Sequence, residues 1–123
     1  MKKIFFALFT FLLAAGAHAQ LAHTKWALTI RINDNDVPTI CTFGKDTLAV
    51  TAEGDGSLIE KMVYTAKEGV LTINKTEGQS DCDMSATGTY KFDIKDNALV
   101  LTLVKDDCSG RAEVLDKSKW AKK

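Results

Sequence analysis

Residues 88–104, GTYKFDIKDNALVLTLV, contain an apolar–polar alternation at residues 89–95 and a mainly apolar run at residues 98–104, joined by a short polar segment. An alternation with a period of two is typical of a strand that has one face in the core. The Lys-Asp-Asn segment at residues 95–97 supplies a turn, so the stretch predicts an antiparallel hairpin. Centring the turn on residues 96 and 97 pairs apolar residues with one another: Tyr90 with Leu103, Phe92 with Leu101, and Ile94 with Leu99.

The same pattern predicts three more hairpins nearer the N-terminus. Polar turns at residues 33–36, 44–46 and 67–69 separate strands predicted over residues 26–32, 37–43, 48–52, 58–65 and 70–74. Apolar residues again face each other in the predicted registers: Ile32 with Val37, Leu28 with Cys41, Trp26 with Phe43, Phe43 with Leu48, Cys41 with Val50, Tyr64 with Leu71, and Met62 with Ile73. Because the hairpins share one apolar face, the sequence predicts one continuous meander.

A meander of seven strands must hide its apolar face and its two edge strands, and closure into an up-and-down barrel does both. Residues 117–121, which include Trp120, are the candidate for an eighth strand that completes the closure. Residues 110–115 have a helical period over one or two turns. We therefore expect an all-β protein: an eight-stranded antiparallel barrel with one short helix near the C-terminus, in a single domain over residues 20–123.

The first nineteen residues are typical of a signal peptide. Lys2 and Lys3 precede an apolar run at residues 4–15, and the Ala-His-Ala at residues 17–19 fits a signal-peptidase site. The run is shorter than the roughly twenty apolar residues that a membrane span needs. The sequence predicts cleavage before Gln20 and a periplasmic or secreted protein without a membrane span. An uncleaved N-terminal anchor is the alternative.

The charge balance gives no sign of a nucleic-acid partner. The chain of 123 residues has 16 Lys and Arg against 16 Asp and Glu, and removal of residues 1–19 takes away two of the lysines. Nucleic-acid binding needs a clustered basic surface, which a balanced composition does not favour. We expect a monomer that binds no nucleic acid.

The three cysteines divide into a predicted pair and a single thiol. Continuing the last hairpin beyond its strands brings Cys82 and Cys108 to the same open end. An exported protein can keep a disulfide there, and it would stabilise the fold by roughly 3 kcal/mol. Cys41 falls on the inward face, where a small buried thiol is the simplest interpretation. A pairing that involves Cys41 is the alternative.

Metal binding and catalysis are not indicated. Asp81, Asp83, Asp106 and Asp107 lie near one end of the predicted barrel, and such carboxylates could hold Ca²⁺. The ligand order of an EF-hand is missing, however, and Asp is common in turns, so solvated turn acids are the preferred interpretation. His23 is the only histidine after residue 19, and no acid is expected on the inward face. We therefore predict no metal, no cofactor and no enzymatic activity.

Trp26 and Arg111 form the most informative long-range pair in the sequence. Trp26 is near the start of the first strand, and Arg111 follows the last long strand. Because the first and last strands become neighbours in a closed barrel, Arg111 could lie across the Trp26 ring. In the alternative interpretation, Arg111 is a surface cation beside the Asp cluster.

These residues carry a resemblance to a known family. The Thr-Lys-Trp at residues 24–26, the hairpin meander, the stretch over residues 88–104 and the Asp-Cys-Ser-Gly-Arg at residues 107–111 are similar to small exported bacterial lipocalin-like (calycin) proteins. The resemblance implies an eight-stranded barrel, open at one end, that binds a small apolar molecule.

Two functions compete at this stage. The first is binding of a small hydrophobic ligand in the barrel, by the inward residues best able to line a pocket: Phe43, Met62, Tyr64, Tyr90 and Phe92. The second is a protein-binding module, such as an inhibitor of an exported hydrolase, with a filled core. Its working surface would be a loop, at residues 53–57 or 74–80.

Overall fold

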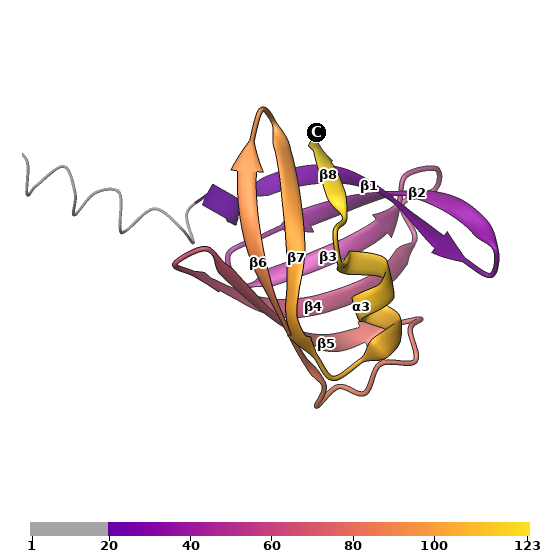
Figure 1. The fold of residues 1–123 in the computed structure, drawn as a ribbon. Helices are drawn as coiled ribbons and strands as arrows, with labels where there is room; N and C mark the ends of the chain where they lie inside the picture. Colours follow the sequence, from indigo (N-terminus) through magenta and orange to yellow (C-terminus); the bar gives the residue numbers. More distant parts are fainter. Residues whose placement is uncertain (1–19) are drawn as a thin grey trace, which may run out of the picture.

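A computed structural model describes residues 20–123, which form one closed antiparallel barrel (Figure 1). Each strand is hydrogen-bonded to its neighbours in the sequence, and the last strand is bonded to the first. The elements are β1 (Thr24–Ile32), β2 (Asn35–Phe43), β3 (Thr47–Ala52), β4 (Leu58–Lys67), β5 (Val70–Gly78), β6 (Thr87–Lys95), β7 (Ala98–Asp106), α3 (Ser109–Leu115) and β8 (Lys119–Lys122). The predicted all-β meander with a short helix near the C-terminus is confirmed. The predicted signal peptide lies outside the described residues.

Tight turns set the registers of three hairpins. Residues 33–34, 68–69 and 96–97 all have positive φ, between 50° and 76°. Two successive residues with positive φ are typical of type I′ turns, whose twist matches that of the flanking strands. Asn, Asp and Gly tolerate this conformation best, and each of these turns contains at least one of them.

The hairpin at residues 88–104 has the predicted register, with Tyr90 opposite Leu103 and Phe92 opposite Leu101. The predicted pairs between β2 and β3 are also present. The other two registers were wrong by two residues: Ile32 pairs with Asn35 instead of Val37, and Tyr64 pairs with Ile73 instead of Leu71. A shift of two keeps each side chain on its face, so the predicted apolar face survives the error.

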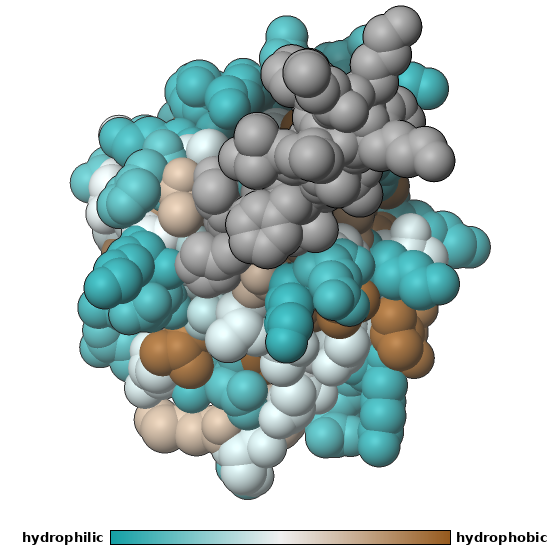
Figure 2. Space-filling model, turned by 90° about the vertical axis from the view of Figure 1, so that its left-hand side faces the viewer, coloured by the Kyte–Doolittle hydropathy of each residue, from teal (hydrophilic) through white to brown (hydrophobic). Residues whose placement is uncertain are grey.

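The inward face of the strands forms the core. Its largest fully buried side chains include Trp26, Phe43, Leu48, Leu71, Ile73, Tyr90, Leu99, Leu101 and Trp120. The outer surface is different: where residues are coloured in Figure 2, the face shown is largely hydrophilic, and apolar residues form separate small areas. The apolar side chains of the strands are therefore concentrated inside the barrel.

The two ends of the barrel differ. The strands β1, β3, β5 and β7 finish, and β2, β4 and β6 begin, at the end that carries the turn at residues 33–34, the loops at residues 53–57 and 79–86, and α3. We call this the α3 end. The turns at residues 44–46, 68–69 and 96–97 lie at the opposite end (Figure 1).

The barrel closes through a short seam. β8 has four residues, and it pairs with β1 only at Trp26 and Ala27. The rest of β1 therefore has no partner in β8, and α3 lies at this side of the barrel before the chain enters β8 (Figure 1). Among residues 20–123, no helix has the length and apolar character needed to cross a membrane.

Candidate functional site

A cavity of about 690 Å³ opens at the α3 end and continues into the barrel. This volume lies within the range of small-molecule sites. Its inner wall is apolar and includes Leu28, Val50, Met62, Leu71, Ile73 and Leu101. Its outer part is polar and includes Arg31, Glu60, Ser80, Asp81, Asp83, Asp107 and Arg111. The cavity therefore offers an apolar interior beneath a charged mouth.

Of the five residues predicted to bind a ligand, Met62 lines this cavity, and the other four are not among its lining residues. Phe43 packs against aromatic rings, edge-on to Tyr64 at 5.0 Å and stacked with Trp120 at 6.0 Å between ring centroids. The Tyr64 hydroxyl donates to the Gly44 carbonyl at 2.7 Å, in the turn opposite the α3 end. Phe43 and Tyr64 thus belong to packed core at the other end of the barrel.

Tyr90 and Phe92 are also buried in the core. The Tyr90 hydroxyl donates to Asp106 Oδ2 at 2.5 Å, so its polar end is already occupied. Burial, followed by the contact with Asp106, raises the pKa of Tyr90 and keeps the phenol neutral.

The cavity wall consists mainly of aliphatic residues that sequence reasoning did not single out. The strand direction could have found them, because it indicates which inward residues lie near the open end.

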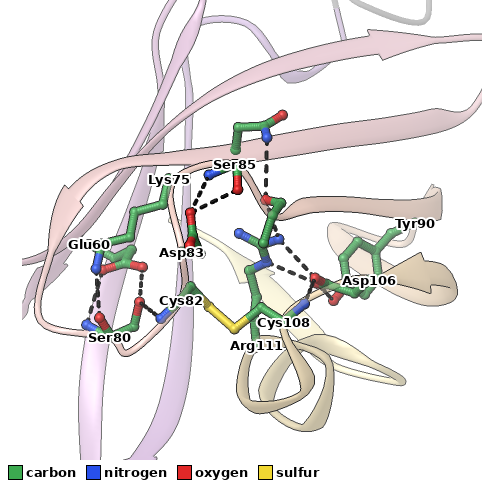
Figure 3. Close-up of a disulfide and its surroundings, with 12 residues drawn as sticks. Glu60, Lys75, Ser80, Cys82, Asp83, Ser85, Tyr90, Asp106, Cys108 and Arg111 are labelled. Atoms are coloured by element: carbon green, nitrogen blue, oxygen red, sulfur yellow. Dashed lines mark hydrogen bonds and ion pairs between the residues drawn. A yellow bond between two sulfur atoms is a disulfide. The ribbon is translucent and has the colours of Figure 1, made fainter.

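The predicted disulfide is confirmed. Cys82 is bonded to Cys108, with the two Cα atoms 5.5 Å apart (Figure 3). It ties the loop at residues 79–86 to the connection between β7 and α3, and both cysteines line the cavity. The mouth is therefore covalently braced on one side.

Cys41 is a free, buried thiol on the cavity wall. Burial raises its pKa to about 12, against the opposing effect of a hydrogen bond with Thr39. The thiolate is the reactive form of cysteine, so this side chain acts as a small apolar residue at neutral pH.

A buried ion pair lies beside the disulfide. Arg111 Nε and Nη2 each donate to a different oxygen of Asp106, both at 2.8 Å (Figure 3). The Cys108 amide donates to the same carboxylate at 2.8 Å. Burial acts to raise the pKa of Asp106, but hydrogen bonds from Arg111, Tyr90 and Cys108 outweigh it and hold the pKa below its ordinary value. The Asp106 side chain is fully buried, so it is not the solvated turn acid that the sequence predicted.

Neither interpretation of Arg111 holds: the side chain is 6% exposed and therefore not a surface cation, and no contact with the Trp26 ring is found among the described residues. The cation over the Trp26 ring is Lys122, with its Nζ 5.1 Å from the ring centroid. Arg111 follows β7, an odd-numbered strand, and therefore lies at the α3 end. Trp26 is near the start of β1, so the two residues lie toward different ends of the barrel.

One guanidinium nitrogen of Arg111 has no hydrogen-bond partner in the described part of the chain. Its Nη2 also donates to the Ala86 carbonyl at 3.0 Å, whereas Nη1 is buried and has no partner within residues 20–123 (Figure 3). Buried polar groups almost always have a hydrogen-bond partner, so each exception needs an explanation. Arg111 itself is one of the residues that line the cavity.

A second polar cluster lies beside the cavity, where Glu60 of β4 and Ser80 of the loop at residues 79–86 are lining residues. Glu60 is buried and accepts hydrogen bonds from the Ser80 hydroxyl and amide, and Lys75 Nζ, which does not line the cavity, donates to the Ser80 carbonyl at 2.6 Å (Figure 3). The expectation of no inward acid was therefore wrong. Glu60 shares the period of Met62, and extending that alternation by two residues would have found it.

The surface acids do not form a metal site. Within residues 20–123, no group of three or more His, Cys, Asp or Glu side chains is placed to hold a metal ion. Asp83 accepts from the Ser85 amide at 2.9 Å and hydroxyl at 2.8 Å, as in a turn, and these bonds lower its pKa. His23 is exposed.

Comparison of the chain with models of known protein families, with curated proteins and with solved structures finds no match. The eight-stranded antiparallel barrel is consistent with a lipocalin-like fold. A function for this chain therefore has to be argued from its cavity and the groups that face it.

Proposed function

We propose that this protein is a lipocalin-like binding protein that holds a small apolar molecule in the cavity at the α3 end, without a cofactor and without catalysis. The observation that carries the proposal is a cavity of about 690 Å³ whose inner wall is aliphatic. An eight-stranded barrel can be filled by its own side chains or can hold one small ligand, and this volume favours the second.

Burial of apolar surface would supply the affinity. A ligand that loses about 300 Å² of apolar surface gains roughly 7.5 kcal/mol at about 25 cal/mol per Å². Part of this is lost in the ordering of both partners, so we expect dissociation constants in the micromolar range or weaker. Glu60 and Asp106, the buried acids described above, already have protein partners, which supports binding over proton-transfer chemistry.

We also propose that the protein is exported to the periplasm or secreted. The Cys82–Cys108 disulfide supports this, because disulfides persist in oxidising compartments. The N-terminal pattern of the sequence points the same way.

The first test is native mass spectrometry of protein purified without denaturation. A small-molecule adduct that is released on unfolding supports the proposal and gives the ligand's mass. Titration with a fluorescent apolar probe then locates the site. Val50→Phe places a larger side chain in the cavity, and we expect it to weaken probe binding at least tenfold.

Val63→Phe is the matched control, because Val63 is 44% exposed and faces outward from β4. It should bind the probe as the wild type does. A folded Val50→Phe variant with wild-type affinity would show that the probe binds elsewhere and would contradict the proposed site.

A protein-binding module is the second candidate. Met84 is 59% exposed in the loop at residues 79–86, which the disulfide tethers at Cys82. A tethered loop loses less entropy on binding a partner. The inhibition of an exported hydrolase by the wild type, and its loss in Met84→Asp, would favour this candidate over ligand binding.

A further inference from the structure

The unpartnered nitrogen of Arg111 indicates that a ligand should carry a hydrogen-bond acceptor. The Arg111 side chain is 6% exposed, and its Nε and Nη2 are taken by Asp106 and the Ala86 carbonyl. Nη1 is buried without a partner in the described part of the chain, and the residue lines the cavity. A buried N–H without an acceptor is unfavourable, so a ligand atom that accepts from Nη1 satisfies it.

The charges around this nitrogen decide whether that acceptor is charged. Asp106 already matches the guanidinium charge through two hydrogen bonds. The charged residues on the cavity lining are Arg31, Glu60, Asp81, Asp83, Asp107 and Arg111, which gives four carboxylates against two cations. Arg31 is further paired with Asp36 at 3.1 Å. A ligand carboxylate would therefore enter a mouth with an excess of negative charge.

We propose that the ligand carries an uncharged hydrogen-bond acceptor, such as a carbonyl or hydroxyl oxygen, which accepts from Arg111 Nη1 while the apolar part of the ligand lies against the aliphatic wall. This inference rests on the proposed binding function and specifies the chemistry of the molecule bound. The ligand enters with its apolar part foremost, because the polar groups are at the mouth and the aliphatic residues are deeper.

Three probes that share the naphthalene ring system test the inference: naphthalene, 2-acetylnaphthalene and 2-naphthoate. They share an apolar body and differ in having no acceptor, a neutral ketone or a carboxylate. We expect 2-acetylnaphthalene to bind to the folded wild type at least fivefold tighter than either of the others, measured by fluorescence titration at pH 7.5. Equal affinity for naphthalene and the ketone overturns the role of Nη1. Tighter binding of 2-naphthoate than of 2-acetylnaphthalene overturns the inference that the acceptor is uncharged.

Two variants separate the hydrogen bond from the charge. Arg111→Lys keeps a cation opposite Asp106 and removes Nη1, so the preference for the ketone over naphthalene should disappear. Glu60→Gln removes one negative charge from the cavity, so 2-naphthoate should bind about fivefold tighter than to the wild type. The matched control is Glu113→Gln, on the exposed side of α3, which should change none of the three affinities.

The outcomes distinguish this inference from the proposed function. If no probe binds, the proposed apolar site fails, and this inference fails with it. If naphthalene binds but the ketone has no advantage, the apolar site stands and only the inference is overturned. If Arg111→Lys does not fold, the wild-type series and Glu60→Gln still decide the outcome.

Discussion

At the scale of single residues, the ion pair of Arg111 with Asp106 joins α3 to the end of β7. The pair is buried, with side-chain exposures of 6% and 0%. Removing one member of a buried pair leaves the other charge without compensation, which typically costs about 3 kcal/mol. We expect Asp106→Asn to lower the free energy of unfolding by about this amount in urea denaturation. Asp93→Asn, an exposed position on β6, is the control and should change it little.

The same pair predicts how stability depends on pH. The pKa of Asp106 is lower in the folded chain than its ordinary value. Such a group stabilises the fold above its unfolded-state pKa of about 4, and this contribution is lost as the pH falls through the folded-state pKa. In calorimetry, the difference in Tm between the wild type and Asp106→Asn should therefore narrow below about pH 4. A difference that stays constant down to pH 2 contradicts this role.

The Cys41 thiol should be unreactive in the native protein. Its thiol is buried, and burial raises its pKa to about 12. We expect no reaction with a disulfide reagent such as Ellman's at pH 8 until the chain unfolds. Denaturation without a reductant should then release one thiol per chain, because the other two of the three cysteines are bonded to each other. Rapid modification of the folded protein would contradict the buried state.

At the scale of the elements, alternation in the sequence predicts the strands and their inward faces. It does not predict the positions of the turns or the points where strands and side chains approach each other closely. Alternation identifies the inward face and survives a register shift of two. The turns at residues 33–34 and 68–69 lie one residue from the centres chosen by matching apolar partners, because positive φ decides their position. Strand direction assigns each connection to one end of the barrel, and it places Arg111 at the α3 end, away from Trp26.

Gly88 is one such close approach, because β6 passes the ion pair there. A Cβ at this position would lie 2.6 Å from Asp106 Oδ2 and 3.1 Å from Arg111 Nη2. Gly88→Ala should therefore displace the pair and lower the free energy of unfolding by about 1–3 kcal/mol. At Gly54 an added Cβ meets nothing within 4 Å, so Gly54→Ala is the matched control. Equal stability of the two variants in urea would show that the pair can move without loss.

At the scale of the whole molecule, the cavity, the disulfide and the buried ion pair all lie at the α3 end. Sequence alone could not establish the cavity, because an eight-stranded barrel is hollow or filled according to the summed volumes of side chains from every strand. The Cys82–Cys108 pairing was predictable because Cys82 precedes β6, Cys108 follows β7, and these two strands pair with each other. The charged mouth depends on Glu60 and Arg111 lying at the same end, which the direction of the strands determines and composition does not.

This arrangement predicts that reduction of the disulfide loosens one end of the barrel before the other. The bond closes a loop of 26 residues, and its loss should lower the free energy of unfolding by roughly 3 kcal/mol. After reduction, hydrogen exchange should rise first at residues 79–86 and in α3, while the turns at residues 44–46 and 96–97 keep their protection. Probe affinity should fall as well, because Cys82 and Cys108 both line the cavity. A uniform rise in exchange around the barrel would instead mean that the disulfide stabilises the closed fold as a whole and does not specifically brace the mouth.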